Sequence, residues 1–213
     1  CEACEEEISP KRLEARPDHA GALARSGARA ERNGDFVGAE RLAAAAIRSD
    51  PGRIEGYLVL ARVRQGRSDL RAALATVQRG LEQIPSQPTL LLRKGELYAR
   101  LGDLHAGRAA FAEYRALYVG NPDGLADASA QEGAVWASAG RRAESLRAYE
   151  RANELAGGSV RYLHPIANLA ESLGNEVLAV RALRQILELE PSDETARRRL
   201  DSLLRGRMPE ILR

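Results

Sequence analysis

Apolar and small residues recur along this chain with the spacing of paired helices. Within residues 20–53, alanines fall at helical spacing on one face, and Pro51 closes the segment. These alanines are Ala39, Ala43 and Ala46. The pair Gly34-Asp35 interrupts the helical pattern, because glycine supplies the positive φ of a helix C-cap and aspartate can cap the next helix. The pattern therefore predicts two antiparallel helices joined by a tight turn.

The same pattern returns at a fixed period. Pro17, Pro51 and Pro85 are each 34 residues apart. Two series of small residues keep this period, apart from one step of 38 residues. The series are Gly34, Ser68, Gly102, Gly140 and Gly174, and Gly27, Ala61, Gly95, Gly133 and Ala167. One four-residue insertion between positions 102 and 133 explains the longer step. Self-similarity at this period is typical of a helical solenoid.

This register divides the chain into a repeat region, 20–193, with a distinct segment at each end. The repeats are 20–53, 54–87, 88–121, 126–159 and 160–193. Residues 1–8 are expected to form a tether and residues 9–19 an N-terminal capping segment. Residues 194–213 are expected to form a C-terminal capping helix and tail, because Asp193 can cap a helix that runs to about Leu204.

Two places depart from the regular pattern. The inserted residues 122–125 amount to nearly one helical turn, about 3.6 residues. They either lengthen the first helix of the fourth repeat or bulge the loop before it. Pro165 falls inside the first helix of the fifth repeat, where a proline costs about 3 kcal/mol. That helix is therefore expected to start late, with Pro165 in its first turn, or to kink there.

The repeated positions resemble the tetratricopeptide repeat (TPR) family, whose pattern is W-x2-L-G-x2-Y followed by a small residue, an aromatic and a proline. The aromatic residues on these signature positions are expected in the core; they are Tyr57, Tyr98, Phe111, Trp136 and Tyr149. Tyr114, Tyr118 and Tyr162 fall elsewhere, and one of them could mark a contact patch. The resemblance implies an all-α, right-handed superhelix of antiparallel helix pairs, with a concave groove lined by the first helix of each pair.

The resemblance also implies which side chains line the groove, at positions 2, 5, 9, 12 and 13 of each repeat. The candidates for contacting a partner are Leu58, Arg62, Leu92, Glu96, Arg100, Arg161, His164 and Asn168. The clamp with which chaperone-binding TPR proteins hold a carboxylate is absent, because only Arg93 among the matching positions could serve. The concave groove is expected to bind an extended or helical segment of a protein partner.

Composition narrows the classes of partner. The chain has 213 residues, 44% of them hydrophobic, and a formal net charge of +2. It contains no run of 18 apolar residues that could span a membrane. The basic residues near the C-terminus are interpreted as a polar outer cap, because acidic residues cancel their charge elsewhere and no aromatic residues interleave with them. They are Arg197, Arg198, Arg199, Arg205 and Arg207. No nucleic-acid partner is expected.

The chain shows none of the common motifs of catalysis. A nucleophile elbow, a phosphate-binding loop, a zinc-protease motif and an EF-hand loop are all missing from the sequence. Carboxylates with arginines nearby are interpreted as solvated helix faces, as for Glu144 with Arg147 and for Glu150 and Glu154 with their neighbouring arginines. Two cysteines and three scattered histidines do not supply the four ligands of a zinc site. The chain is predicted to be non-enzymatic, without a cofactor or a metal.

The sequence starts with Cys1, and an acidic stretch and Cys4 follow. Bacterial lipoproteins carry an acylated cysteine as the mature first residue, followed by a short polar tether. Cys1 is therefore expected to be a lipidation site that anchors the chain on the periplasmic side of a bacterial membrane. The alternative is that Cys1 marks only an arbitrary boundary in a cytoplasmic protein. Cys4 is expected to be a spare thiol or part of the tether; a disulfide with Cys1, which requires that Cys1 is not acylated, comes second, and metal binding comes last.

A terminal cysteine, a tether and TPR-like repeats together are similar to the TPR lipoproteins that help to assemble pili, secretins or outer-membrane machinery, including type IV pilus systems. The leading hypothesis is a non-enzymatic protein–protein interaction scaffold on the membrane. Two alternatives remain: a soluble cytoplasmic TPR adaptor in a regulatory complex, or an accessory subunit of an enzyme system such as cytochrome maturation or polysaccharide export. The roughly 20 residues encoded before Cys1 would discriminate among them.

Overall fold

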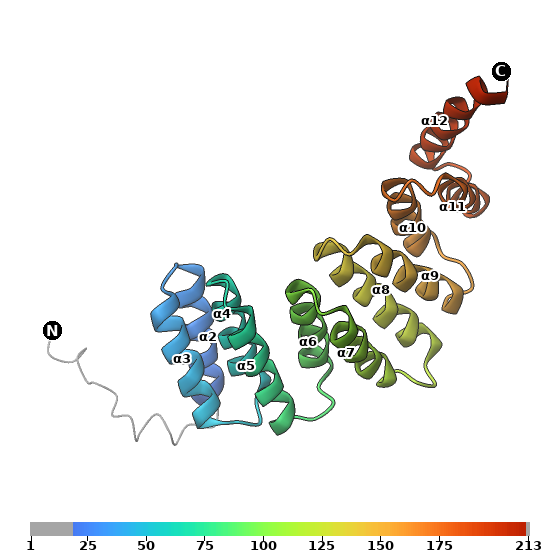
Figure 1. The fold of residues 1–213 in the computed structure, drawn as a ribbon. Coiled ribbons are helices and arrows are strands. Elements are labelled where there is room, and N and C mark those ends of the chain that lie inside the picture. The colour runs from blue at the N-terminus through green and yellow to red at the C-terminus, as the bar shows by residue number, and fades with distance from the viewer. Residues whose placement is uncertain (1–18, 212–213) are drawn as a thin grey trace, which may run out of the picture. The chain divides into compact units, whose positions relative to one another are not determined.

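A computed structural model describes residues 19–211, and the side chains of this range up to residue 205 (Figure 1). All secondary structure in the described range is helical, so the all-α prediction is confirmed. The expectations for Cys1, Cys4 and the tether lie outside the described residues, as does the N-terminal capping segment 9–19 apart from His19, which begins the first described helix.

Of the described residues, 19–103 make up a compact N-terminal unit. Its helices are α2 (His19–Arg32), α3 (Phe36–Ser49), α4 (Ile54–Gly66), α5 (Leu70–Gln83) and α6 (Pro88–Leu101). Each helix packs on the next one, and α2 also packs on α4. The first helices of the first two repeats therefore stack directly on each other, as expected where one helix pair is too small to bury its own apolar face.

The described residues 104–211 make up the C-terminal unit. Its helices are α7 (Leu104–Ala116), α8 (Pro122–Ser138), α9 (Arg142–Leu155), α10 (Val160–Ser172), α11 (Glu176–Leu189) and α12 (Glu194–Ile211). Here too each helix packs on its successor. The cap helix α12 runs beyond the predicted end at Leu204, and the Asp193 carboxylate caps it by accepting a hydrogen bond from the Ala196 N–H at 2.9 Å.

The turns within the helix pairs explain the first series of small residues. Each turn contains one residue in the left-handed region, and these residues are Gly34 (φ 81°), Ser68 (63°), Gly102 (82°), Gly140 (73°) and Gly174 (71°). Glycine adopts this conformation without strain, whereas Ser68 carries a side chain there. In three turns the following residue caps the next helix through its side chain, with hydrogen bonds of 2.8–3.1 Å. These capping residues are Asp35, Asp69 and Asn175.

The second series marks close contacts between helices. A Cβ atom at Gly27 would lie 3.3 Å from the carbonyl oxygen of Ala39, and one at Gly133 would lie 2.8 Å from Cδ2 of Tyr149. Ala61 and Ala167 of the same series are buried. Small residues at these positions therefore let the helices approach each other closely.

The signature aromatic residues divide into two groups. Tyr57, Phe111 and Trp136 are fully buried, and the rings of Phe111 and Trp136 meet edge to face with centroids 5.2 Å apart. Tyr98 and Tyr149 are only half-buried. Tyr114 and Tyr162 fall outside the signature but are also buried, so neither forms an exposed contact patch. Of these three tyrosines, Tyr118 alone stays half-exposed, and its ring packs against Tyr114 with centroids 5.5 Å apart.

The structure bears on both departures from the repeat. The insertion lengthens α8, which has 17 residues, against 13 or 14 in α2–α7 and α9–α11. The predicted late start of the fifth repeat is wrong, because α10 begins at Val160 and Pro165 lies in its second turn. Proline cannot donate a hydrogen bond to the Arg161 carbonyl. Burial of Leu163 and Ile166 on either side of it offsets that loss.

Candidate protein-binding surface

In the N-terminal unit, an ion pair joins the first helices of consecutive repeats. Nε of Arg62 on α4 lies 2.7 Å from both carboxylate oxygens of Glu31 on α2, and Nη2 lies 2.6 Å from one of them. Such two-point pairing fits the planar guanidinium fork. The hydrogen bonds to Glu31 raise the pKa of Arg62 above its usual value. Arg62 is therefore exposed but held in one place.

A second polar link has the same position in the repeat. Nε2 of Gln65 on α4 donates to the Glu96 carboxylate on α6 at 3.1 Å. Arg93 donates to the same carboxylate at 2.5 Å, and Arg100 lies 4.0 Å from it. Both links join position 12 of one repeat to position 9 of the next repeat. Glu96 is thus a centre for three polar side chains. Leu58 and Leu92, one helical turn before Arg62 and Glu96 respectively, are half-buried.

In the C-terminal unit, the predicted residues lie on α10 and face different neighbours. Arg161 forms an ion pair of 2.7 Å with Asp127 on α8, and the Tyr162 hydroxyl donates to the same carboxylate at 2.9 Å. His164 Nε2 lies 3.1 Å from the Asp193 carboxylate at the start of α12. Asn168 is exposed. Arg161 therefore contacts the preceding repeat, and His164 contacts the C-terminal cap helix.

The predicted site residues thus fall into two groups. Leu58, Arg62, Leu92, Glu96 and Arg100 lie on α4 and α6 of the N-terminal unit, whereas Arg161, His164 and Asn168 lie on α10 of the C-terminal unit. In each group, charged residues join one helix to another: Arg62 joins α4 to α2, Arg161 joins α10 to α8, and His164 joins α10 to the start of α12. Their role in binding a partner stays a prediction. On α8, Ala130 is buried, whereas Ala134 and Ala137 are exposed.

One group of charged residues was misjudged from the sequence. Glu144 was interpreted as part of a solvated face, but its side chain is only 14% exposed and accepts a hydrogen bond of 3.1 Å from Arg108 on α7. Glu132 on α8, which no sequence motif marks, is also buried and has three hydrogen-bonding partners. Burial also raises the pKa of Glu150, with a smaller contribution from Glu154.

The described residues contain neither of two other kinds of site. Between residues 19 and 211, no helix combines the length and apolar character needed to cross a bilayer. In the same range, histidine, cysteine, aspartate and glutamate side chains form no group of three or more that could hold a metal ion.

Solved structures with similar folds define the class of this chain. A crystal structure of the MamA protein is similar over 84% of this chain and 96% of its own, with a TM-score of 0.58 and 22% identity. A tetratricopeptide repeat protein from Parabacteroides merdae is similar over 86% and 72% of the two chains, with a TM-score of 0.56 and 20% identity. PilF of Pseudomonas aeruginosa is similar over 79% and 75%, with a TM-score of 0.56 and 15% identity.

These similarities show that the chain has a TPR-type fold. At identities of 22% and below they bear on the fold alone. No family model and no curated protein matches the chain.

Proposed function

We propose that this protein is a non-enzymatic scaffold that binds a segment of another protein on the surface of its first helices. The observation that carries the proposal is the surface of α4 and α6. There, half-buried Leu58 and Leu92 each lie one helical turn before a charged residue, Arg62 or Glu96, and Arg100 follows Glu96 by one more turn. A few apolar anchors surrounded by fixed polar groups suit the capture of a peptide segment. The TPR-type fold supports this choice.

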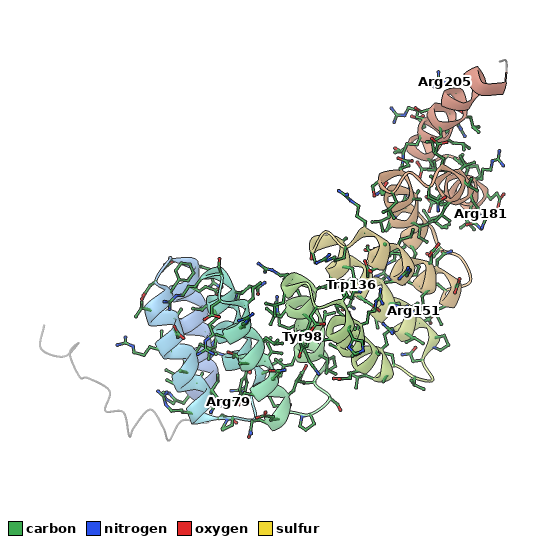
Figure 2. The ribbon with its side chains drawn as sticks, viewed as in Figure 1. Arg79, Tyr98, Trp136, Arg151, Arg181 and Arg205 are labelled. Atoms are coloured by element: carbon green, nitrogen blue, oxygen red, sulfur yellow. The ribbon has the colours of Figure 1, made fainter. Side chains whose placement is uncertain are left out.

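The test must separate partner binding from the stability of the unit. Arg62 and Glu96 also join adjacent helices, so glutamine is a better replacement than alanine because it keeps hydrogen-bonding capacity. We expect the triple variant R62Q/E96Q/R100Q to remain folded and to capture less partner from membrane extracts. A control with the same charge changes is R41Q/R79Q/E82Q, on exposed positions of the second helices α3 and α5 (Figure 2 labels Arg79).

A photo-crosslinking residue at Leu92 makes the test more direct. It should form one defined cross-linked product that the triple variant loses, whereas a cross-linker at Arg41 should not form that product. Two results together would contradict a binding site on the first helices: equal capture of the partner by both triple variants, and formation of the same cross-linked product from a cross-linker at position 41.

The finer proposal is that Cys1 is acylated and that the scaffold helps to assemble an envelope complex such as a pilus, a secretin or outer-membrane machinery. The support is the sequence of Cys1 and the acidic residues after it. Expression of the full-length precursor with Cys1→Ser should move the protein from the membrane fraction to the aqueous fraction. An unchanged distribution, with the wild-type chain in the aqueous fraction, would favour the cytoplasmic adaptor.

A further inference from the structure

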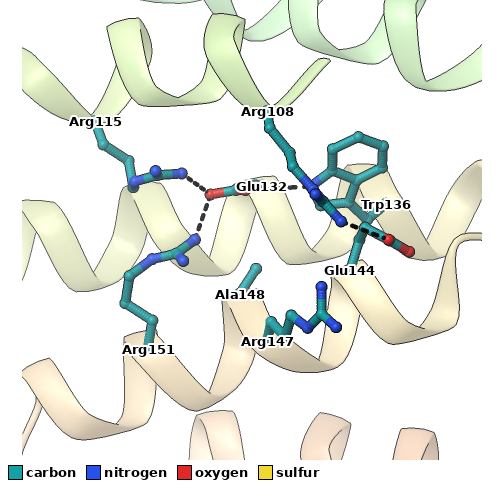
Figure 3. Close-up of a pocket in the computed structure, with 8 residues that line it drawn as sticks. All are labelled: Arg108, Arg115, Glu132, Trp136, Glu144, Arg147, Ala148 and Arg151. Atoms are coloured by element: carbon teal, nitrogen blue, oxygen red, sulfur yellow. Dashed lines mark hydrogen bonds and ion pairs between the residues drawn. The ribbon is translucent and has the colours of Figure 1, made fainter. Parts of the chain in front are cut away.

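A charged pocket of about 300 Å³ opens among α7, α8 and α9 of the C-terminal unit (Figure 3). Its charged lining residues are Arg108 and Arg115 of α7, Glu132 of α8, and Glu144, Arg147 and Arg151 of α9. It involves none of the residues assigned above to partner binding. The volume is at the lower end of the range of ligand sites, about 300–1,000 Å³.

Glu132 organises the inner side of this pocket. Its side chain is buried, with 5% of its surface exposed. One carboxylate oxygen accepts a hydrogen bond from the Trp136 indole N–H at 3.2 Å. The other accepts from Arg151 Nη2 at 2.5 Å and from Arg115 (Figure 3). Both oxygens are therefore engaged, and two guanidinium groups are held in fixed places by one carboxylate.

The outer side of the pocket is less fully paired. Arg108 donates to Glu144 at 3.1 Å through one of its nitrogens. No hydrogen bond or ion pair joins Arg147 to the other residues drawn in Figure 3, and this side chain is exposed. Four guanidinium groups face two carboxylates, so the lining carries two positive charges in excess. Positively charged walls of low dielectric attract anions.

A second pocket in the N-terminal unit gives an internal comparison. It lies at the same place in the repeat, since Glu40 and Arg108 both occupy position 21, and Arg64 and Trp136 both occupy position 11. Its charged lining is Glu40, Arg64, Arg67 and Asp69, which is balanced. Glu40 accepts from Arg64 at 3.3 Å and from Arg67 at 3.0 Å. The excess positive charge therefore belongs to the C-terminal pocket and is not a general property of this repeat position.

We propose that the C-terminal pocket binds a phosphate group. Guanidinium groups bind phosphate oxygens through pairs of parallel hydrogen bonds. A phosphate monoester carries a charge of about −1.5 to −2 at pH 7, which matches the excess of two better than a single carboxylate does. Arg147 and the unpaired nitrogens of Arg108 contact the phosphate, and Glu132 keeps Arg115 and Arg151 in position behind it.

A tryptophan in the pocket allows ligand binding to be followed by fluorescence. Trp136 lines it and is the one tryptophan of the chain. Titration of the full chain with inorganic phosphate at constant ionic strength should change the tryptophan fluorescence saturably. Loss of a charge-assisted hydrogen bond weakens binding about tenfold, so Arg147→Gln should raise the Kd for phosphate by about that factor. Two matched controls should leave the Kd unchanged: Arg181→Gln, on an exposed site of α11 (Figure 2), and Arg67→Gln, in the balanced pocket.

Two further arms identify the source of the phosphate. A phosphoserine peptide that binds at least tenfold more tightly than inorganic phosphate, while its unmodified form does not bind, supports a phosphorylated protein partner. Equal affinity for the peptide and for inorganic phosphate supports a small phosphate compound. An unsaturable response to phosphate, an unchanged Kd in Arg147→Gln, or tighter binding of glutamate than of phosphate overturns the proposal. These outcomes are independent of the capture assay on α4 and α6.

Discussion

Gly133→Leu measures how closely α8 and α9 approach each other. A Cβ atom at Gly133 would lie 2.8 Å from Cδ2 and 2.9 Å from Cε2 of Tyr149, which is inside van der Waals contact. The backbone there is held as well, because the Ser145 hydroxyl donates to the Gly133 carbonyl at 2.8 Å. A leucine adds three carbons beyond Cβ, so either the two helices separate or the tyrosine ring leaves its place.

The expected cost follows from this geometry. Overpacking in a well-packed core costs about 1–3 kcal/mol, and we expect the upper end because both the ring and the backbone resist. For a chain of this length about 1 kcal/mol lowers Tm by about 2–4 °C, so Gly133→Leu should lower Tm by about 6–12 °C. Thermal unfolding followed by circular dichroism measures the change.

Two controls isolate the contact with Tyr149. Ala134→Leu makes a similar change at the next position of α8, which is exposed, and should shift the free energy of unfolding by about 0.5 kcal/mol or less. Tyr149→Ala removes the ring, so Gly133→Leu should cost at least about 1 kcal/mol less in that background. The reasoning is refuted if Gly133→Leu melts like the parent, or if its cost is the same with and without Tyr149.

Three further predictions concern single residues. Ser68→Gly should stabilise the protein by about 0.5–1 kcal/mol in chemical denaturation. The left-handed conformation of Ser68 costs an L-residue about 1–2 kcal/mol, and the greater backbone entropy that glycine loses on folding cancels part of the relief. Ser68→Ala should give no stabilisation, because alanine has the same backbone strain. Glu132→Ala should lower the free energy of unfolding by about 3 kcal/mol, because it leaves Arg115 and Arg151 without their shared carboxylate, and equal denaturation midpoints would contradict this. The hydrogen bond from the Ala196 N–H holds the pKa of Asp193 below its usual value. The ionised Asp193 carboxylate therefore stabilises the folded protein above the unfolded pKa of about 3.9, and this stabilisation is lost as pH falls through the lower folded pKa. The protection of α12 amides against hydrogen exchange, corrected for the intrinsic exchange rate at each pH, should therefore fall below about pH 4 in the wild type. Asp193→Ala should abolish this acid-dependent step, with the protection of α12 already lower at neutral pH.

The fold could be predicted because its determinants are local. One left-handed residue in each turn, and one small residue at each close helix contact, recur at a fixed period, as Gly34 and Gly27 illustrate in the first repeat. These requirements restrict the residue type at fixed positions, so they can be recognised in a single sequence. Pro165 shows the limit, because a local rule predicted a late helix start and tertiary burial of the neighbouring residues prevailed.

The charged network around Glu132 could not be predicted in the same way. Its partners Arg115 and Arg151 are 17 and 19 residues away and lie on two other helices. In the sequence, these residues are ordinary charged positions on helices, and only the crossing of α7, α8 and α9 brings them together. The burial of Glu144 was missed for the same reason, since its partner Arg108 is 36 residues away.

The long helix α8 shows where a chain of this kind can change its length. Inside a helix pair, the turn is specified residue by residue, and an added residue would displace either the left-handed position or the cap. The join before α8 instead accommodates residues 122–125 as a new first turn, capped by Asn121 at 3.0 Å from the Gly124 N–H. Gly133 and Trp136 still occupy their signature positions and remain buried. For protein engineering, the exposed residues Val119 and Gly120, just before this cap, are therefore the preferred place for a peptide tag or a fluorescent label.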